Sequence, residues 1–253
     1  MKKILLYAFI LLVLGLLLGT GISFAQEGPV KWNAVPKTVA IISEYETPRG
    51  TQYAFGTGCI ATADGYIVTN AHVVRNADRI TVYDSELNEY GARIVGLHSE
   101  CDIALIKILP ADPLEYFDEE TWVANPNQVF LMDEVYAIGH PYGSIFTITR
   151  GTISNKLEGQ DGVRYFQTDA SLNPGNSGGA LVNRWGQLIA INVSAIPAFF
   201  AENMGYAIAV GSFVEEIRMM IEEDMARLEV FENIREYVNS KWTRYYNQSY
   251  YGN

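Results

Sequence analysis

The sequence predicts an all-β domain in two halves, followed by a helical C-terminal extension. Short β-rich runs separated by turn residues recur from Thr38 to Val210, which is typical of a sandwich or barrel. A segment rich in proline and acidic residues, Pro110 to Pro126, divides these runs into two comparable halves. After Gly211 the apolar residues recur in steps of three and four, which indicates helix.

The composition is that of a folded, acidic protein. The chain of 253 residues is 49% hydrophobic and 19% charged, which suits one or two compact units. A formal net charge of -11 repels a nucleic-acid backbone, so nucleic acid is not expected as a partner. The sequence shows no cluster of metal ligands and no phosphate-binding loop, and we expect neither a metal nor a cofactor.

Residues 1–25 have the pattern of an export signal. Two lysines precede an apolar run, residues 4–25, which ends in small residues that fit cleavage after Ala25. The same run is long enough to remain as a membrane anchor, since a spanning helix needs about 20 residues. The lysines hold the N-terminus in the cytoplasm, so in both cases the rest of the chain is expected outside it: secreted, periplasmic or anchored and facing outward.

The β-rich domain is expected to cover residues 26–211, with its halves at about 38–110 and 127–211. The runs that predict its strands are Thr38 to Glu44, Tyr66 to Thr69, Arg79 to Tyr83, Asp102 to Ile108, Phe146 to Ile153, Val163 to Thr168, Gln187 to Val193 and Met204 to Val210.

The C-terminal tail, residues 212–253, is predicted to be one long helix or two abutting helices. Ser212 and Glu215 fit a capping box at its start. Its apolar stripe either packs on the second half of the domain or mediates assembly, and both interpretations stay open. The stripe comprises Val214, Ile217, Ile221, Met225, Leu228, Phe231, Ile234, Val238 and Trp242.

The chain has two cysteines, Cys59 and Cys101. An oxidising compartment allows a bridge between them. Cys59 lies on an expected core strand and Cys101 beside a candidate catalytic residue, so two buried thiols are an equal alternative.

The strongest local signal for chemistry is the run from Asp169 to Gly179, which surrounds Ser177 with glycine and asparagine. A serine hydroxyl is a poor nucleophile at neutral pH, so it needs an adjacent base and N–H donors for the oxyanion that forms. The glycines permit a tight turn that aims the N–H groups of Gly175 and Ser177 at one point. We expect Ser177 to be the nucleophile and these two N–H groups to form the oxyanion hole; the alternative is a loop without chemistry.

Chain order selects among the classes of serine hydrolase. The Gly-x-Ser-x-Gly pattern around Ser177 also fits the α/β-hydrolases, which place their histidine after the serine. Here His72, His98 and His140 all precede it. The subtilisin order needs an aspartate before the histidine, and Asp64, eight residues before His72, is too close. The remaining order, His, Asp, Ser, is that of chymotrypsin.

His72 and Asp102 complete the expected catalytic set. His72 lies at the end of a predicted strand, where a side chain emerges into a cleft, and Asp102 heads an apolar strand. A buried acid at that place needs a partner, which the imidazole N–H of His72 supplies; the alternative is that Asp102 only caps the strand. His98 and His140 lie beside turn residues and are expected to be structural or surface residues.

Several motifs in a fixed order resemble the HtrA/Deg serine proteases over about residues 38–211. The resemblance implies a chymotrypsin-like fold of two six-stranded antiparallel β-barrels, with the catalytic triad in the cleft between them. It also implies a serine endopeptidase acting on unfolded, misfolded or exported polypeptides. The family usually has asparagine where this chain has His140. The motifs are Gly56 to Gly58, Thr69 to Val74, Asp102 to Ala104, Ala137 to Gly143 and Thr168 to Gly179.

The chain also departs from that family. Nothing after Gly211 resembles a PDZ domain, and the loop from Tyr45 to Gln52 is short, so regulation by a triggering peptide is not expected. Trypsin-type zymogens place an aspartate before the nucleophile, whereas this chain has Asn176, so activation by cleavage is not expected either. The family commonly forms trimers, and a homo-oligomer is a further expectation.

The residue six places before the nucleophile, Ser171, lies at the base of the primary specificity pocket in trypsin-like enzymes. A neutral serine does not neutralise a buried Lys or Arg side chain, and no histidine follows the nucleophile to receive a Glu side chain. The resemblance implies apolar pocket walls of modest size, which predict cleavage after Val, Ala, Ile and similar residues. Besides Ser171, the expected pocket residues are Leu172, Ser194, Ala195 and Ile196.

Two other functions fit the same residues. A catalytically inactive barrel would bind and hold exported proteins. An esterase would use the same acyl transfer to water.

Overall fold

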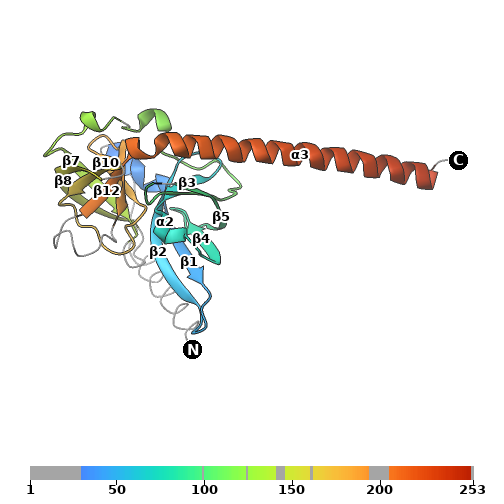
Figure 1. Cartoon of the computed structure of the whole chain (residues 1–253), viewed down its shortest axis with the longest axis horizontal. Helices are drawn as coiled ribbons and strands as arrows, with labels where there is room; N and C mark the ends of the chain where they lie inside the picture. The colour runs from blue at the N-terminus through green and yellow to red at the C-terminus, as the bar shows by residue number, and fades with distance from the viewer. Residues whose placement is uncertain are drawn as a thin grey trace.

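Two closed, six-stranded antiparallel barrels form the body of the protein, and one long helix leaves it (Figure 1). The computed structural model describes residues 30–98, 100–123, 125–140, 146–159, 162–193 and 205–251. The predicted all-β fold with a C-terminal helix is confirmed. The predicted export signal, residues 1–25, lies outside the described residues.

The first barrel is closed in the order β1-β2-β3-β6-β5-β4. Every residue of β3 and β6 is buried, as expected for strands enclosed on both faces. Its apolar interior is built from β-branched residues, among them Val39, Ile67, Val82 and Ile106. The strands are β1 (Thr38–Tyr45), β2 (Gln52–Ile60), β3 (Tyr66–Thr69), β4 (Arg79–Tyr83), β5 (Glu89–Leu97) and β6 (Ala104–Lys107).

The second barrel repeats this architecture in the order β10-β11-β12-β9-β8-β7. Its interior holds Val135, Phe166, Leu181 and Ile189. The strands are β7 (Glu134–Gly139), β8 (Thr147–Glu158), β9 (Arg164–Thr168), β10 (Ala180–Asn183), β11 (Leu188–Val193) and β12 (Gly205–Ala209).

The predicted connection between the halves joins β6 to β7 and is anchored by aromatic side chains. Phe117 is fully buried, and its carbonyl accepts a hydrogen bond from the Trp122 indole at 2.8 Å. Short 3-10 turns η2 (Glu119–Thr121) and η3 (Pro126–Gln128) interrupt this segment, and a similar turn, η1 (Val30–Lys37), precedes β1. A one-turn α-helix, α2 (Ala71–Val74), follows β3.

The C-terminal helix α3 (Val214–Tyr251) is continuous over 38 residues, so the single-helix prediction is confirmed. One face of its first turns is buried: Val214 and Ile217, with Phe213 directly before the helix, belong to the core cluster that spans both barrels. The C-terminal part of the helix projects away from the body (Figure 1). From Met225 to Tyr237 its apolar residues, including Leu228, are exposed.

Three local predictions need correction. Strand β6 begins at Ala104, two residues after Asp102, because Asp102 lies in a tight turn. The proposed capping box is wrong: α3 begins at Val214, after the 3-10 turn η5 (Val210–Ser212), and the Ser212 hydroxyl accepts the Arg164 N–H at 2.9 Å. The base of α3 packs on β5 of the first barrel as well, and not on the second barrel alone.

Within the described part of the chain, none of the helices combines the length and the apolar character needed to cross a membrane.

Candidate active site

His72 and Asp102 come together at one end of the first barrel. His72 lies in α2, the helical turn that directly follows β3, and not at a strand end as predicted. One oxygen of the Asp102 carboxylate accepts the backbone N–H of His72 at 2.8 Å, and the other accepts from Nδ1 of the His72 ring. A carboxylate that accepts both hydrogen bonds fixes the orientation of the imidazole ring, so that Nε2 faces away from the aspartate. Both side chains are partly exposed, 38% for His72 and 35% for Asp102.

The backbone of Asp102 is tied to the segment that carries His72. The Asp102 carbonyl accepts the side-chain amide of Asn70 at 2.8 Å and the backbone N–H of Ala71 at 3.3 Å. Together with the carboxylate bonds, these contacts join the β3–α2 segment to the turn before β6. The alternative in which Asp102 merely caps a strand does not describe this geometry, because its carboxylate bonds to His72.

Ser177 lies in the loop between β9 and β10 of the second barrel. Gly175 and Gly178 adopt φ values of 103° and 84°, the left-handed region that glycine reaches without strain. Gly178 also has no room for a side chain, since a Cβ would lie 2.1 Å from the Thr57 carbonyl oxygen. A hydrogen bond joins the loop to β11: the Gly178 N–H donates to the Asn192 carbonyl at 2.9 Å.

Thr57, at the centre of β2, joins the Ser177 loop to the first barrel. Its N–H donates to the Ser177 carbonyl at 2.8 Å, and its hydroxyl donates to the Gly175 carbonyl at 2.7 Å. Its own carbonyl accepts the Thr69 hydroxyl at 2.6 Å, on the strand that leads into His72. One buried residue of the first barrel therefore holds the serine loop and the end of the histidine strand together. Thr57 belongs to the Gly56 to Gly58 motif, and no local signal in the sequence predicts this role for it.

His140 lies behind the same loop. Its N–H donates to the Thr57 hydroxyl at 3.0 Å, and its Nδ1 accepts the Phe146 N–H at 3.3 Å. The ring packs edge-on against Phe146, with 4.7 Å between centroids. Burial lowers the pKa of His140 to about 4, because the charged imidazolium is poorly solvated there. His140 is thus structural and buried, as is His98; neither is a surface residue.

The two cysteines are buried and form no disulfide bond. Cys59, on β2, donates its thiol to the Gly178 carbonyl at 3.6 Å and so contacts the serine loop. Burial raises the pKa of the Cys59 thiol, which keeps it protonated and unreactive.

The structure describes two of the expected pocket residues. Ser171 is exposed, and its carbonyl accepts the Thr149 hydroxyl at 2.9 Å. Leu172 is half-buried against Gly205 of β12, where a Cβ would lie 2.8 Å from the leucine side chain. Gly205 therefore leaves the space that Leu172 occupies. Ser194, Ala195 and Ile196 lie outside the described residues.

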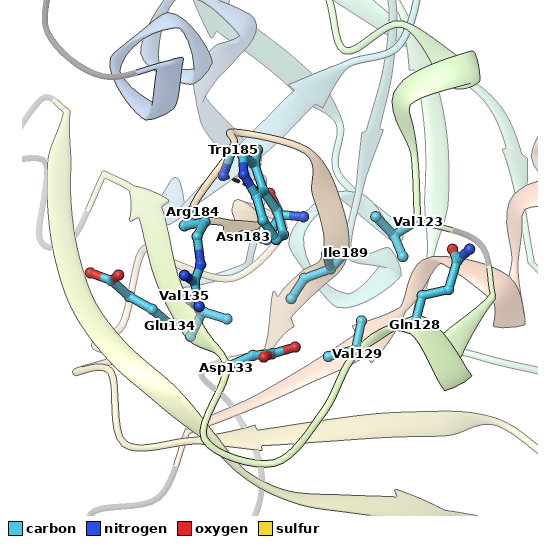
Figure 2. A pocket seen from close by; sticks show the side chains of 10 residues that line it. All are labelled: Val123, Gln128, Val129, Asp133, Glu134, Val135, Asn183, Arg184, Trp185 and Ile189. Atoms are coloured by element: carbon cyan, nitrogen blue, oxygen red, sulfur yellow. Dashed lines mark hydrogen bonds between the residues drawn. The ribbon is translucent and has the colours of Figure 1, made fainter.

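A separate pocket lies on the second barrel, between the start of β7 and the β10–β11 turn (Figure 2). Trp185, Arg184 and Asp133 line part of it. It shares no residue with the His72, Asp102 and Ser177 group, so it is not the candidate active site. Among the residues that the structure describes, no group of three or more His, Cys, Asp or Glu side chains is placed to hold a metal ion.

The family model for the trypsin-like peptidase domain matches residues 56–191, more than half of the chain. The chain belongs to the trypsin-like peptidase family. The match begins at β2 and ends in β11, so it contains His72, Asp102 and Ser177.

Within this family, the chain is similar to HtrA-type proteases. It is 41% identical over 157 residues to a probable periplasmic serine endoprotease DegP-like of Chlamydia trachomatis, covering 60% of this chain and 31% of that protein. It is 44% identical over 164 residues to a probable serine protease do-like of Buchnera aphidicola, covering 62% of this chain and 33% of that protein. The chain thus spans about a third of the length of these curated relatives.

Solved structures agree with this similarity. The HtrA-type protease AlgW, solved with a tripeptide, superposes with a TM-score of 0.66 at 32% identity, covering 77% of this chain and 63% of that one. Its resemblance supports the chymotrypsin-like assignment of the two barrels, which the sequence analysis expected.

Proposed function

We propose that this chain is a serine endopeptidase of the HtrA type, in which His72, Asp102 and Ser177 act as a catalytic triad. The observation that carries the proposal is the pair of hydrogen bonds that the Asp102 carboxylate accepts from His72, in a trypsin-like fold whose serine loop is anchored to the same barrel. A carboxylate in that position orients the imidazole and stabilises it when it becomes charged.

In the proposed reaction, His72 takes the proton of the Ser177 hydroxyl as its oxygen attacks the carbonyl carbon of the scissile peptide bond. The tetrahedral intermediate places its negative oxygen at the N–H groups of Gly175 and Ser177. His72 then gives the proton to the leaving amine, and the C–N bond breaks to leave an acyl-enzyme. Water, deprotonated by His72, attacks the acyl carbon of the ester. The bond from that carbon to the serine oxygen then breaks as His72 returns the proton to Ser177, and the carboxylic acid product leaves.

The fixed backbone of the serine loop supports this assignment of the oxyanion hole. The Gly175 carbonyl is held by the Thr57 hydroxyl and the Ser177 carbonyl by the Thr57 N–H, which fixes the peptide unit that follows each of the two N–H donors. Donors that are preorganised in this way need not reorient as charge develops, and removal of one such donor costs about 10²–10³ in kcat in other serine proteases.

The substrates in this proposal are unfolded, misfolded or exported polypeptides, cleaved after Val, Ala, Ile or similar residues. The absence of charge at Ser171 and the apolar side chain of Leu172 support the preference. Mass-spectrometric mapping of cut sites in an unfolded protein tests it. A majority of cuts after Lys, Arg, Glu or Asp would show that the pocket residues are misassigned.

The proposed location is outside the cytoplasm, secreted, periplasmic or tethered to the membrane through residues 4–25. The similar protein of Chlamydia trachomatis is named as a probable periplasmic endoprotease, which is consistent with this location. We also propose that the chain forms a homo-oligomer through the exposed stripe of α3.

Covalent labelling tests the central proposal. A fluorophosphonate probe should modify Ser177 in the purified protein, residues 26–253, and Ser177→Ala should remain unlabelled. On an unfolded protein substrate, Ser177→Ala and His72→Ala should each lower turnover by about 10⁶, and Asp102→Asn by about 10⁴.

The two other functions give different results in the same assays. An inactive binding module would retain affinity for unfolded protein without labelling. An esterase would be labelled and would hydrolyse an ester substrate, but would leave the protein substrate intact.

A further inference from the structure

His98 is a buried histidine in the turn that precedes Asp102. Only 6% of its side chain is exposed. Its Nδ1 accepts two backbone N–H groups, from Glu100 at 3.1 Å and from Cys101 at 3.3 Å. The imidazole therefore stabilises the turn by accepting its backbone N–H groups, as the side chain of Asp or Asn does in an Asx turn.

The other ring nitrogen contacts the C-terminal helix. His98 Nε2 lies 3.2 Å from a carboxylate oxygen of Glu216, in the first turn of α3. Because Nδ1 accepts from two N–H donors, it carries a lone pair, and the ring proton resides on Nε2. Glu216 accepts that proton in a hydrogen bond and so favours the tautomer that the turn requires.

Asp102 lies within the same turn, one residue before its end. The His98 N–H donates to the Ile103 carbonyl at 2.9 Å, and the Ile103 N–H donates to the Cys101 carbonyl at 2.8 Å, on either side of the aspartate. The direction of the Asp102 carboxylate is therefore set by a closed turn, one side of which rests on the His98 ring.

Glu216 is itself held in place by the base of α3. Phe213 and Ile217, on either side of it in sequence, are buried, and Phe213 packs edge-on against Trp122 with 6.5 Å between ring centroids. Two residues further along, Arg218 pairs with Glu119 in the connection between the barrels. The carboxylate thus projects from a rigid part of the helix.

We propose that His98 and Glu216 are positioning residues that couple the base of α3 to the orientation of Asp102. The pair fixes the turn, the turn fixes the carboxylate, and the carboxylate orients His72. This inference rests on the proposed protease function, in which Asp102 serves His72.

The test compares variants that remove or retain the acceptor at residue 98. His98→Leu leaves the Glu100 and Cys101 N–H groups without their partner and should lower the maximal rate of fluorophosphonate labelling by about tenfold, with probe affinity unchanged. His98→Asn keeps an acceptor for the same N–H groups but has no Nε2–H for Glu216, so it should lower the rate less than His98→Leu does.

The helix side of the pair has a matched control on the same turn. Glu216→Ala should lower the labelling rate, and Glu216→Gln should retain it, since an amide oxygen still accepts from Nε2–H. Glu215→Ala should have no effect, because the Glu215 carboxylate is exposed and contacts Arg218. An equal loss in Glu215→Ala and Glu216→Ala would show a general helix effect and overturn the proposal.

NMR separates this inference from the proposed function. In the wild-type protein, imidazole ¹⁵N shifts should identify the Nε2–H tautomer of His98, and the Nδ1–H resonance of His72 should shift in His98→Leu and Glu216→Ala. These readouts need no activity, so an unlabelled wild-type protein would refute the protease function alone. An unmoved His72 resonance, or a His98→Leu labelling rate equal to that of wild type, would overturn the coupling. If His98→Leu fails to fold, Glu216→Ala decides by the same criteria: an unmoved His72 resonance or a wild-type labelling rate would overturn the coupling.

Discussion

At the scale of single residues, a few buried polar groups decide the shape of the site. Thr57 is fully buried and uses its N–H, its carbonyl and its hydroxyl in hydrogen bonds to the segments around the serine and histidine. A buried polar group that loses its partner costs about 1–3 kcal/mol, so such residues tolerate little change.

Replacing Thr57 by valine should impair both stability and catalysis. The Gly175 carbonyl loses its donor and the His140 N–H its acceptor, so we expect a loss of about 2–4 kcal/mol in the free energy of unfolding. Turnover should fall by about 10–100-fold as the oxyanion loop loosens. Urea denaturation and steady-state kinetics measure the two effects. Thr57→Ser is the control, because it keeps the hydroxyl; a serine variant as impaired as the valine variant would contradict the role of the hydrogen bonds.

His140 should make stability dependent on pH. Its pKa is about 6.5 when unfolded and about 4 when folded, so both states are neutral above pH 6.5 and the contribution to stability is complete there. As the pH falls from 6.5 toward 4, the unfolded chain binds a proton that the folded protein does not, and stability is lost, by roughly 3 kcal/mol in total.

The measurement is urea denaturation across that pH range. His140→Asn keeps an acceptor for the Phe146 N–H and has no titrating ring, so its stability curve should lack this part of the slope. Parallel curves for the wild type and the variant would show that His140 does not titrate between the two states.

At the scale of elements, α3 consists of two parts with different surroundings. Its base supplies Phe213, Val214 and Ile217 to the core, and Asp224 ends this part by pairing with Arg93 and accepting the Tyr66 hydroxyl at 2.8 Å. The arginine lowers the pKa of Asp224, which keeps the carboxylate charged. Beyond this point the apolar side chains of the helix are exposed as far as Tyr237, the last residue whose side chain the structure describes.

Two truncations should therefore behave differently. A chain ending at Gly211 lacks three buried apolar side chains, and removal of a single one costs about 2–5 kcal/mol, so it should not fold cooperatively. A chain ending at Met225 keeps all of them and should unfold within a few degrees of the full chain. Thermal unfolding followed by circular dichroism compares them. Cooperative unfolding of the shorter chain near the full-length temperature would contradict a structural role for the helix base.

At the scale of the whole molecule, the distal part of α3 exposes a row of apolar side chains. Leu228, Phe231 and Ile234 recur at helical spacing and are 46%, 64% and 56% exposed. A contiguous apolar stripe of this kind is usually covered by a partner. The proposed partner is a second copy of this chain.

Self-association should depend on that stripe. The full chain should elute as an oligomer in size-exclusion light scattering, whereas the chain ending at Met225 and the double variant Leu228→Glu with Phe231→Glu should be monomers. Glu229→Gln is the matched control, because it changes the charge of the helix at a position outside the apolar stripe. A monomeric full chain would refute assembly through α3.

Much of the molecule followed from local patterns. Apolar runs between turn residues identified strands in both barrels, and steps of three and four residues identified α3, because strands and helices expose one face with fixed periodicity. Strands β2, β5, β7 and β10 were not among the quoted runs; β2 contains two glycines and β5 has exposed residues along its length, which weakens the apolar signal. The candidate triad was predicted from residue chemistry and chain order. Few residue types can act as nucleophile, general base or orienting carboxylate, so few positions in the sequence were candidates.

The sequence by itself determined the fold class, the long helix and the identity of His72, Asp102 and Ser177 as candidates. Only the tertiary structure showed that Thr57 links the serine and histidine segments, that α3 is buried at its base and exposed beyond, and that Glu216 reaches His98. These contacts join residues that are remote in the chain, by 118 positions for Thr57 and Gly175. Local periodicity carries no information about such pairs, because they depend on how the two barrels and the helix pack together.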